Sequence, residues 1–192
     1  MTRMSNPLTP AVEAGDAAAV DALCRQHPRL ANTYDDQEHG WGNEQWLPLH
    51  RAAFAGQAAD IHVLIEHGCH PDARTRFATP DHARATALHW AAWMGHADAA
   101  TALLDRRATI DLRDFEGSTP LHYAALCGKP ATAKVLIDRG ADVNVRDDRG
   151  RSPLLLAIVG GPGWAADKRQ DEVAELLIAA GADVNARCPQ DT

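Results

Sequence analysis

The sequence predicts an all-α solenoid, in which short helix pairs repeat along the chain and stack on one another. Equivalent residues recur at a fixed spacing of 33, as between Gly117 and Gly150 and between His89 and His122. Several copies contain the same helix start, clearest in the Thr-Pro-Leu-His of residues 119–122. A second apolar helix follows each start. A fixed period of this length, made of units too small to fold alone, is typical of repeat architectures.

The first copy, residues 8–33, is divergent. It reads as two helices around Gly15, with Val20 and Leu23 on the buried side. The Thr-Pro-Leu-His start is missing, and Pro28 stands where later copies have Gly. An end unit has one neighbour to pack against, so its outer side can be polar. We therefore predict that this copy caps the stack.

The second and third copies, residues 46–75 and 85–114, are regular in their helices but irregular in the turns before them. The start Leu47-Pro48-Leu49-His50 arrives late, which indicates an insertion at 34–45. The next start is also delayed, which indicates a second insertion at 76–84. At the end of the third copy, Arg107 replaces the usual Gly, at a cost of about 1 kcal/mol if the backbone there is left-handed.

The fourth copy, residues 115–147, shows why each segment forms a helix. Thr119 is placed to cap the helix amides, and Pro120 fits the first helical position, where a missing N–H costs nothing. Ala124 and Ala125 give a narrow face that lets a neighbouring helix approach closely. The second helix of this copy is predicted over Ala131–Arg139.

The fifth copy, residues 148–187, starts with Ser152-Pro153-Leu154 and lacks the His. Its second helix is delayed by eight residues, because Gly140 and Gly181 are 41 apart rather than 33. We place a third insertion at 162–168. All copies together make residues 1–192 a single domain.

These features resemble the ankyrin repeat family, and the resemblance extends over residues 8–187. It implies helix-turn-helix units with hairpin loops, stacked into a curved solenoid whose concave face is built from the first helices and the loops. The abundance of Ala, Arg, Asp and Gly resembles that of bacterial proteins. Repeats of this family have many unrelated partners, so function has to be argued from the surface.

Composition excludes several classes of function. The formal net charge of −7 and the absence of clustered Lys and Arg disfavour nucleic acid as a partner. No apolar stretch approaches the roughly 18 to 20 residues needed to cross a membrane, and residues 1–21 contain no signal-peptide core. The four cysteines form no Cys-x-x-Cys pair, so free thiols in a reducing compartment are expected. We therefore expect a cytoplasmic protein.

The candidate binding site is a row of apolar residues around the two positions that follow each Ala-Ala pair. In ankyrin repeats these positions project to the concave side, and aromatic residues and Met are enriched at the centres of protein interfaces. The predicted partner-binding residues are Phe54, Trp90, Trp93, Met94, Tyr123 and Leu126. We expect the partner to be another protein, with a role for this chain as an inhibitor, an immunity or antitoxin-like protein, or a scaffold. The row could also hold a second copy, so we expect a monomer or a weak homo-oligomer.

Three tryptophans in or directly beside the insertions leave two alternatives open. Trp41, Trp46 and Trp164 could fold back over the apolar row and bury it inside the molecule. They could equally form the wall of a pocket for a small molecule or a metal ion, which is the competing hypothesis for function.

The histidines at the helix starts, His50, His89 and His122, are expected to bond turns of neighbouring copies rather than a metal. The compact cluster of potential ligands is His67 and His70, with Cys69 and Asp72 beside them. Short His pairs are common without a metal, so no metal and no cofactor is predicted.

Enzymatic activity is not predicted. His122 and Cys127 are five residues apart in one helix, so their side chains point in different directions. The run Gly160-Gly161-Pro162-Gly163 lacks the Lys-Ser/Thr of a phosphate-binding loop.

Overall fold

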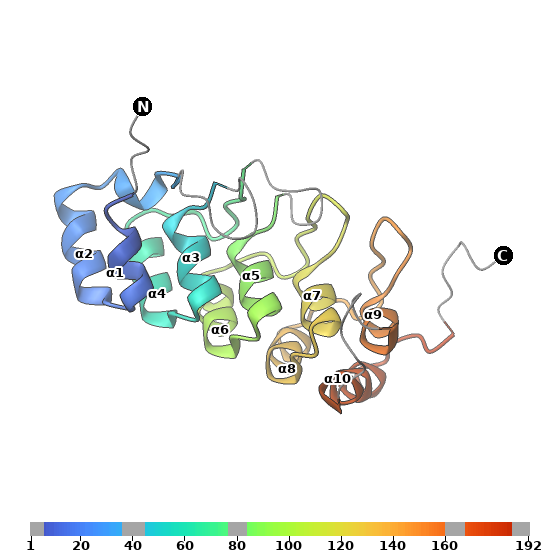
Figure 1. Cartoon of the computed structure of the whole chain (residues 1–192). Helices are drawn as coiled ribbons and strands as arrows, with labels where there is room; N and C mark the ends of the chain where they lie inside the picture. The colour runs from blue at the N-terminus through green and yellow to red at the C-terminus, as the bar shows by residue number, and fades with distance from the viewer. Residues whose placement is uncertain (1–5, 36–44, 77–83, 160–167, 186–192) are drawn as a thin grey trace.

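The computed structural model describes residues 6–35, 45–76, 84–159 and 168–185. Within these ranges the chain is helical, and the described residues form no strand beyond isolated β-bridges (Figure 1). The helices are α1 (Thr9–Ala14), α2 (Ala17–Gln26), α3 (Pro48–Ala55), α4 (Ala58–Glu66), α5 (Ala87–Met94), α6 (Ala97–Asp105), α7 (Pro120–Leu126), α8 (Pro130–Asp138), α9 (Pro153–Val159) and α10 (Lys168–Ala179), with a 3₁₀ turn at Leu30–Asn32.

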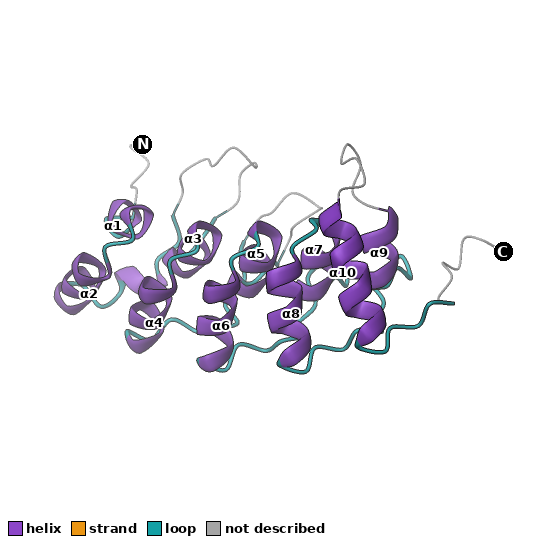
Figure 2. Ribbon diagram, turned by 90° about the horizontal axis from the view of Figure 1, so that it is seen from below, coloured by secondary structure: helices purple, strands orange, loops and turns teal. Residues whose placement is uncertain are grey.

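The helices lie in two parallel rows (Figure 2). The first helices α1, α3, α5, α7 and α9 form the inner row, and the second helices α2, α4, α6, α8 and α10 form the outer row. Each helix packs against its partner in the same copy and against its counterparts in adjacent copies. The first helix pair, α1 and α2, and the last, α9 and α10, lie at opposite ends of the stack. The predicted all-α solenoid of helix-turn-helix units is therefore confirmed.

The histidines at the helix starts of the third and fourth copies each bond a loop of the following copy. The Nδ1 atom of His122 accepts the backbone N–H of Thr119 at 3.1 Å, and Nε2 lies 3.0 Å from the carbonyl of Arg151 in the following copy. His89 repeats this arrangement with Thr86 and with Ser118. Since Nδ1 accepts a backbone N–H, the ring proton is on Nε2, which donates to the next loop. The predicted bonding to a turn of the neighbouring copy is confirmed for His89 and His122, whereas His50 bonds the carbonyl of Ala73 within its own copy.

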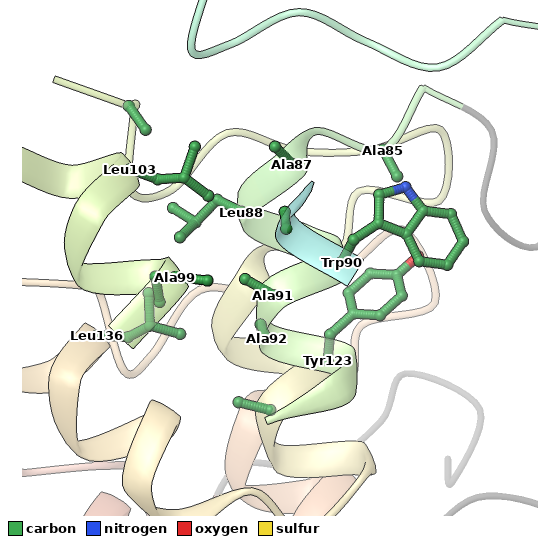
Figure 3. Packing of buried hydrophobic residues seen from close by; sticks show 14 of the residues in the cluster. Ala85, Ala87, Leu88, Trp90, Ala91, Ala92, Ala99, Leu103, Tyr123 and Leu136 are labelled. Atoms are coloured by element: carbon green, nitrogen blue, oxygen red, sulfur yellow. The ribbon is translucent and has the colours of Figure 1, made fainter. Parts of the chain in front are cut away.

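The Ala-Ala pairs form the tightest part of the stack. Ala91, Ala92, Ala124 and Ala125 are completely buried. Side chains this small let the inner-row helices approach closely, as the sequence predicts. In the outer row, Leu103 and Leu136 fill the space between the helices (Figure 3).

The second helices of the second, fourth and fifth copies end at a glycine with positive φ, whereas the first and third copies have another residue at this place. Gly140 has a φ of 90°, in the left-handed region. Arg107 occupies the same place in the third copy with a φ of 66°. The predicted local strain at Arg107 is therefore present.

The three predicted insertions lie largely outside the described residues, which end at 35, 76 and 159 and resume at 45, 84 and 168. Their stems, however, are described and are paired. Antiparallel bridges join Asp35 to Trp46, Gln45 to Arg76, and Arg74 to Thr86. The stems of the first two insertions therefore lie side by side. No helix in the described part of the chain is long and apolar enough to span a bilayer.

Candidate partner-binding surface

The stem of the first insertion covers the N-terminal part of the predicted apolar row. Trp46 packs against Trp90, with ring centroids 4.5 Å apart, and against Phe54 at 5.3 Å. Phe54 and Trp90 complete the cluster at 6.0 Å. Only 3% of Trp46 and 2% of Trp90 is exposed to solvent. Trp90 is therefore a core residue, which corrects its predicted place in an exposed row.

Trp46 is held in this position from both sides of the insertion. Its carbonyl accepts the N–H of Asp35 at 2.8 Å, and the neighbouring Gln45 exchanges two backbone hydrogen bonds with Arg76. The guanidinium of Arg76 lies 4.0 Å from the centroid of the Tyr34 ring. These contacts join the two stems into one platform, which fixes the indole of Trp46 over the inner row.

A buried ion pair lies at the N-terminal end of the apolar row. Arg51 of α3 is bonded to Asp35 at 3.0 Å and to Glu13 at 2.9 Å. Thr9 donates its hydroxyl to the same carboxylate of Asp35 at 2.6 Å. A buried charge needs such partners to offset its desolvation. The cap, the second copy and the insertion stem are therefore linked by one polar cluster.

Tyr123 is also part of the core, contrary to the prediction of an exposed residue. Its hydroxyl donates to Asp114 at 2.6 Å, and the carboxylate of Asp114 also accepts the N–H groups of Glu116 and Ser118. Trp93 lies against Tyr123, with ring centroids 5.4 Å apart. Figure 3 shows Trp90 and Tyr123 next to each other, on the opposite side of the inner row from Leu103 and Leu136.

The remaining residues of the row form a smaller surface toward the C-terminal end, here called the open inner surface. Trp93, Met94 and Leu126 are half-buried, and Val159 is 69% exposed. They come from three successive helices of the inner row, α5, α7 and α9. Phe54 is half-buried as well, but Trp46 and Trp90 flank its ring. The structure thus separates the six predicted residues into two buried ones, one flanked one and three accessible ones.

One exposed apolar residue was not predicted. Ile158 is 63% exposed on α9, beside Val159. In the period it corresponds to Ala125, which is completely buried by the next copy. The replacement of a small packing residue by Ile in the last copy is visible in the sequence and could have located it.

The compact cluster in the second copy is occupied by internal contacts. His67 is bonded to Asp21 at 2.8 Å, and the thiol of Cys69 donates to the carbonyl of Ala31 at 2.9 Å. His70 accepts the N–H of Asp72. Among the described residues, no three His, Cys, Asp or Glu side chains are arranged to hold a metal ion.

Burial determines the protonation states of the inner-row side chains. It lowers the pKa of His50 and of His89 to about 4, and it also lowers the pKa of His122. Burial raises the pKa of the Cys127 thiol to about 11. A nucleophilic cysteine needs a low thiol pKa, so Cys127 lacks the character of a reactive thiolate near neutral pH.

A pocket of about 500 Å³ lies on the N-terminal cap. It is lined by Pro7, Gln26, His27, Pro28, Arg29 and Leu30. None of these residues belongs to the insertions that the competing hypothesis invoked. Trp41 and Trp164 lie outside the described residues, whereas Trp46 fills the space against Phe54 and Trp90.

Comparison with known proteins agrees with the geometry. The family model of ankyrin repeats in three copies matches residues 88–188, just over half of the 192 residues. The chain therefore belongs to the ankyrin repeat family. No curated protein matches it closely enough to add a more specific relationship. Ankyrin repeats are generally modules for protein–protein interaction, and the family is typically not enzymatic.

Proposed function

We propose that this protein binds another protein through the open inner surface. The observation that carries the proposal is the exposure of apolar side chains on successive inner-row helices, ending with Val159 at 69% exposure. An accessible apolar surface on a folded protein is a common mark of an interaction site. Trp93 and Met94 add an aromatic residue and a flexible thioether, both of which are enriched at interfaces.

The stem of the first insertion sets the limit of this surface. Trp46 lies against Phe54 and Trp90, so among the described residues the part of the row that is open to a partner begins at Trp93. We further propose that the protein holds one specific partner, as an inhibitor, an immunity or antitoxin-like protein, or a scaffold. The net charge of −7 favours a basic partner through electrostatic steering.

The proposal is tested with two matched charge insertions. Met94→Glu places a carboxylate on the open inner surface, and Ile178→Glu places one on α10 of the outer row, where Ile178 is 50% exposed. Tagged wild type and both variants are used to capture proteins from a lysate of the source organism, and bound proteins are quantified by mass spectrometry. We expect a protein that is retained by wild type and Ile178→Glu but depleted at least about tenfold by Met94→Glu.

Substitution of Trp93 would be a poor test, because this side chain packs against the core and against Tyr123. Circular dichroism of each variant must therefore show the same thermal midpoint as wild type before capture is compared. Equal capture by Met94→Glu and wild type would refute binding through the open inner surface. A partner lost only from Ile178→Glu would move the binding site to the outer row.

A further inference from the structure

Asp60 stands at a position of the outer row that the fold keeps apolar or small. It precedes the buried Leu64 by four residues, and the same offset in the later copies is occupied by Ala99, Thr132 and Val173. In the capping copy, Val20 precedes the buried Cys24 by the same four residues. All five side chains are completely buried. A carboxylic acid has therefore been placed inside the stack, where its counterparts carry a methyl group, isopropyl groups or one hydroxyl.

The carboxyl group of Asp60 has no hydrogen-bond partner among the described residues. Native proteins bond nearly all of their buried polar groups, because leaving one unbonded costs about 1 to 3 kcal/mol and more when it is charged. Thr132 shares this property in milder form, since its buried hydroxyl also has no partner in the described part of the chain.

The charged groups on the helices that pack against α4 do not compensate Asp60. These helices are α2, α3 and α6, and their basic side chains are paired elsewhere. Arg25 pairs with Asp21, Arg51 with Asp35, and Arg106 with Glu66 and His62. His50 of α3 bonds the carbonyl of Ala73, and His67 at the end of α4 bonds Asp21. His96, which precedes α6, bonds the carbonyl of Phe54. The further carboxyl groups at these helices are those of Asp16, Asp98 and Asp105, of which Asp105 pairs with Arg139, and α2 also carries the thiol of Cys24.

Both burial and this acidic neighbourhood act on Asp60 in the same direction. Burial, and secondarily the charge of Asp16, raise the pKa of Asp60 to about 6. In an unfolded chain the carboxyl would titrate near its ordinary value of 3.8.

We propose that Asp60 is a built-in pH-sensitive weak point of the stack: the protonated side chain is compatible with closed packing of α4 against α2 and α6, and ionisation loosens this junction. This junction around Asp60 lies in the outer row of the first three copies and is separate from the open inner surface. It therefore goes beyond partner binding, and its test requires no partner.

The sign of the effect follows from proton linkage. Between pH 3.8 and about 6 the folded chain binds more protons at Asp60 than the unfolded chain does. The contribution of Asp60 to stability therefore decreases as pH rises through this interval, and above it the full penalty of the buried charge is present. At pH 5 the carboxyl is mostly protonated in the folded chain and mostly ionised in the unfolded chain.

The experiment compares urea unfolding of wild type, Asp60→Asn and Asp60→Val at pH 5 and pH 7.5. Asn keeps the shape without a charge, and Val is the residue of the first and last copies at this position. We expect the unfolding equilibrium constant of wild type, relative to Asp60→Asn, to rise about tenfold from pH 5 to pH 7.5. Titrations of other groups cancel in this ratio. Asp60→Val should be more stable than wild type at pH 7.5.

Thr132→Val is the matched control, because it removes a buried, unpartnered hydroxyl that does not ionise. Its stability relative to wild type should be the same at both pH values. Carboxyl carbon NMR gives a second, independent readout, with a midpoint for Asp60 near 6 rather than near 3.8. A ratio of wild type to Asp60→Asn that is constant with pH, or an NMR midpoint below about 4.5, would overturn the proposal.

Discussion

The buried histidines at the helix starts should make this protein sensitive to acid. Lowering the pH from 7 to 5 should decrease the free energy of unfolding. In the folded chain the pKa of His50 and that of His89 are both about 4, compared with an ordinary value of 6.5. Their neutral form is required because Nδ1 accepts a backbone N–H and could not do so once protonated. The stability that these residues contribute is complete above pH 6.5 and is lost as pH falls toward 4.

The magnitude follows from the two pKa values. At pH 5 an unfolded histidine is almost fully protonated and the folded one is almost fully neutral. The difference amounts to about 2 kcal/mol per histidine between pH 7 and pH 5. His50 and His89 together therefore account for about 4 kcal/mol, with a further loss from His122. This is a large part of the roughly 5 to 15 kcal/mol by which typical domains are stable.

The assay is urea unfolding at pH 7, 6 and 5, followed by circular dichroism in an Asp60→Asn background. This background is needed because Asp60 titrates with the opposite sign over the same interval. The comparison variant is His89→Gln, since a Gln at the third helical position can still reach back to the N–H of Thr86. We expect His89→Gln to lose about 2 kcal/mol less than its parent between pH 7 and pH 5. Equal losses in the two chains, or no loss in the parent, would refute the reasoning.

Two further substitutions test the packing. Trp46→Ala removes a buried indole that contacts Phe54 and Trp90. Thermal or urea unfolding should therefore show a decrease of about 3 to 5 kcal/mol in the free energy of unfolding. A decrease below about 1 kcal/mol would mean that the stem is not packed as described. Arg107→Gly relieves a left-handed backbone and should increase the free energy of unfolding by up to about 1 kcal/mol, whereas a decrease would contradict the assigned conformation.

The local features of this protein were readable from its sequence because each depends on a few neighbouring residues. The Pro120 start, the bonded histidines and the Ala-Ala pairs recur with the period and have the same physical reason in each copy. The helix predicted over Ala131–Arg139 is observed over Pro130–Asp138, a shift of one residue. The strain at Arg107 was predictable for the same reason, since a single backbone conformation decides it.

Exposure along the inner row was decided by tertiary structure. Concave-side positions that are equivalent in the period have different surroundings, because residues 35 and 46 pair and bring Trp46 over Trp90. Tyr123 was predicted to face solvent, but a hydrogen bond to Asp114 nine residues away draws it into the core. Periodicity identifies which residues face the same direction, whereas accessibility depends on non-local contacts that interrupt the period. The sequence by itself therefore determined the repeat, its helix starts and its narrow alanine faces, and the folded structure alone decided which part of the apolar row remains open.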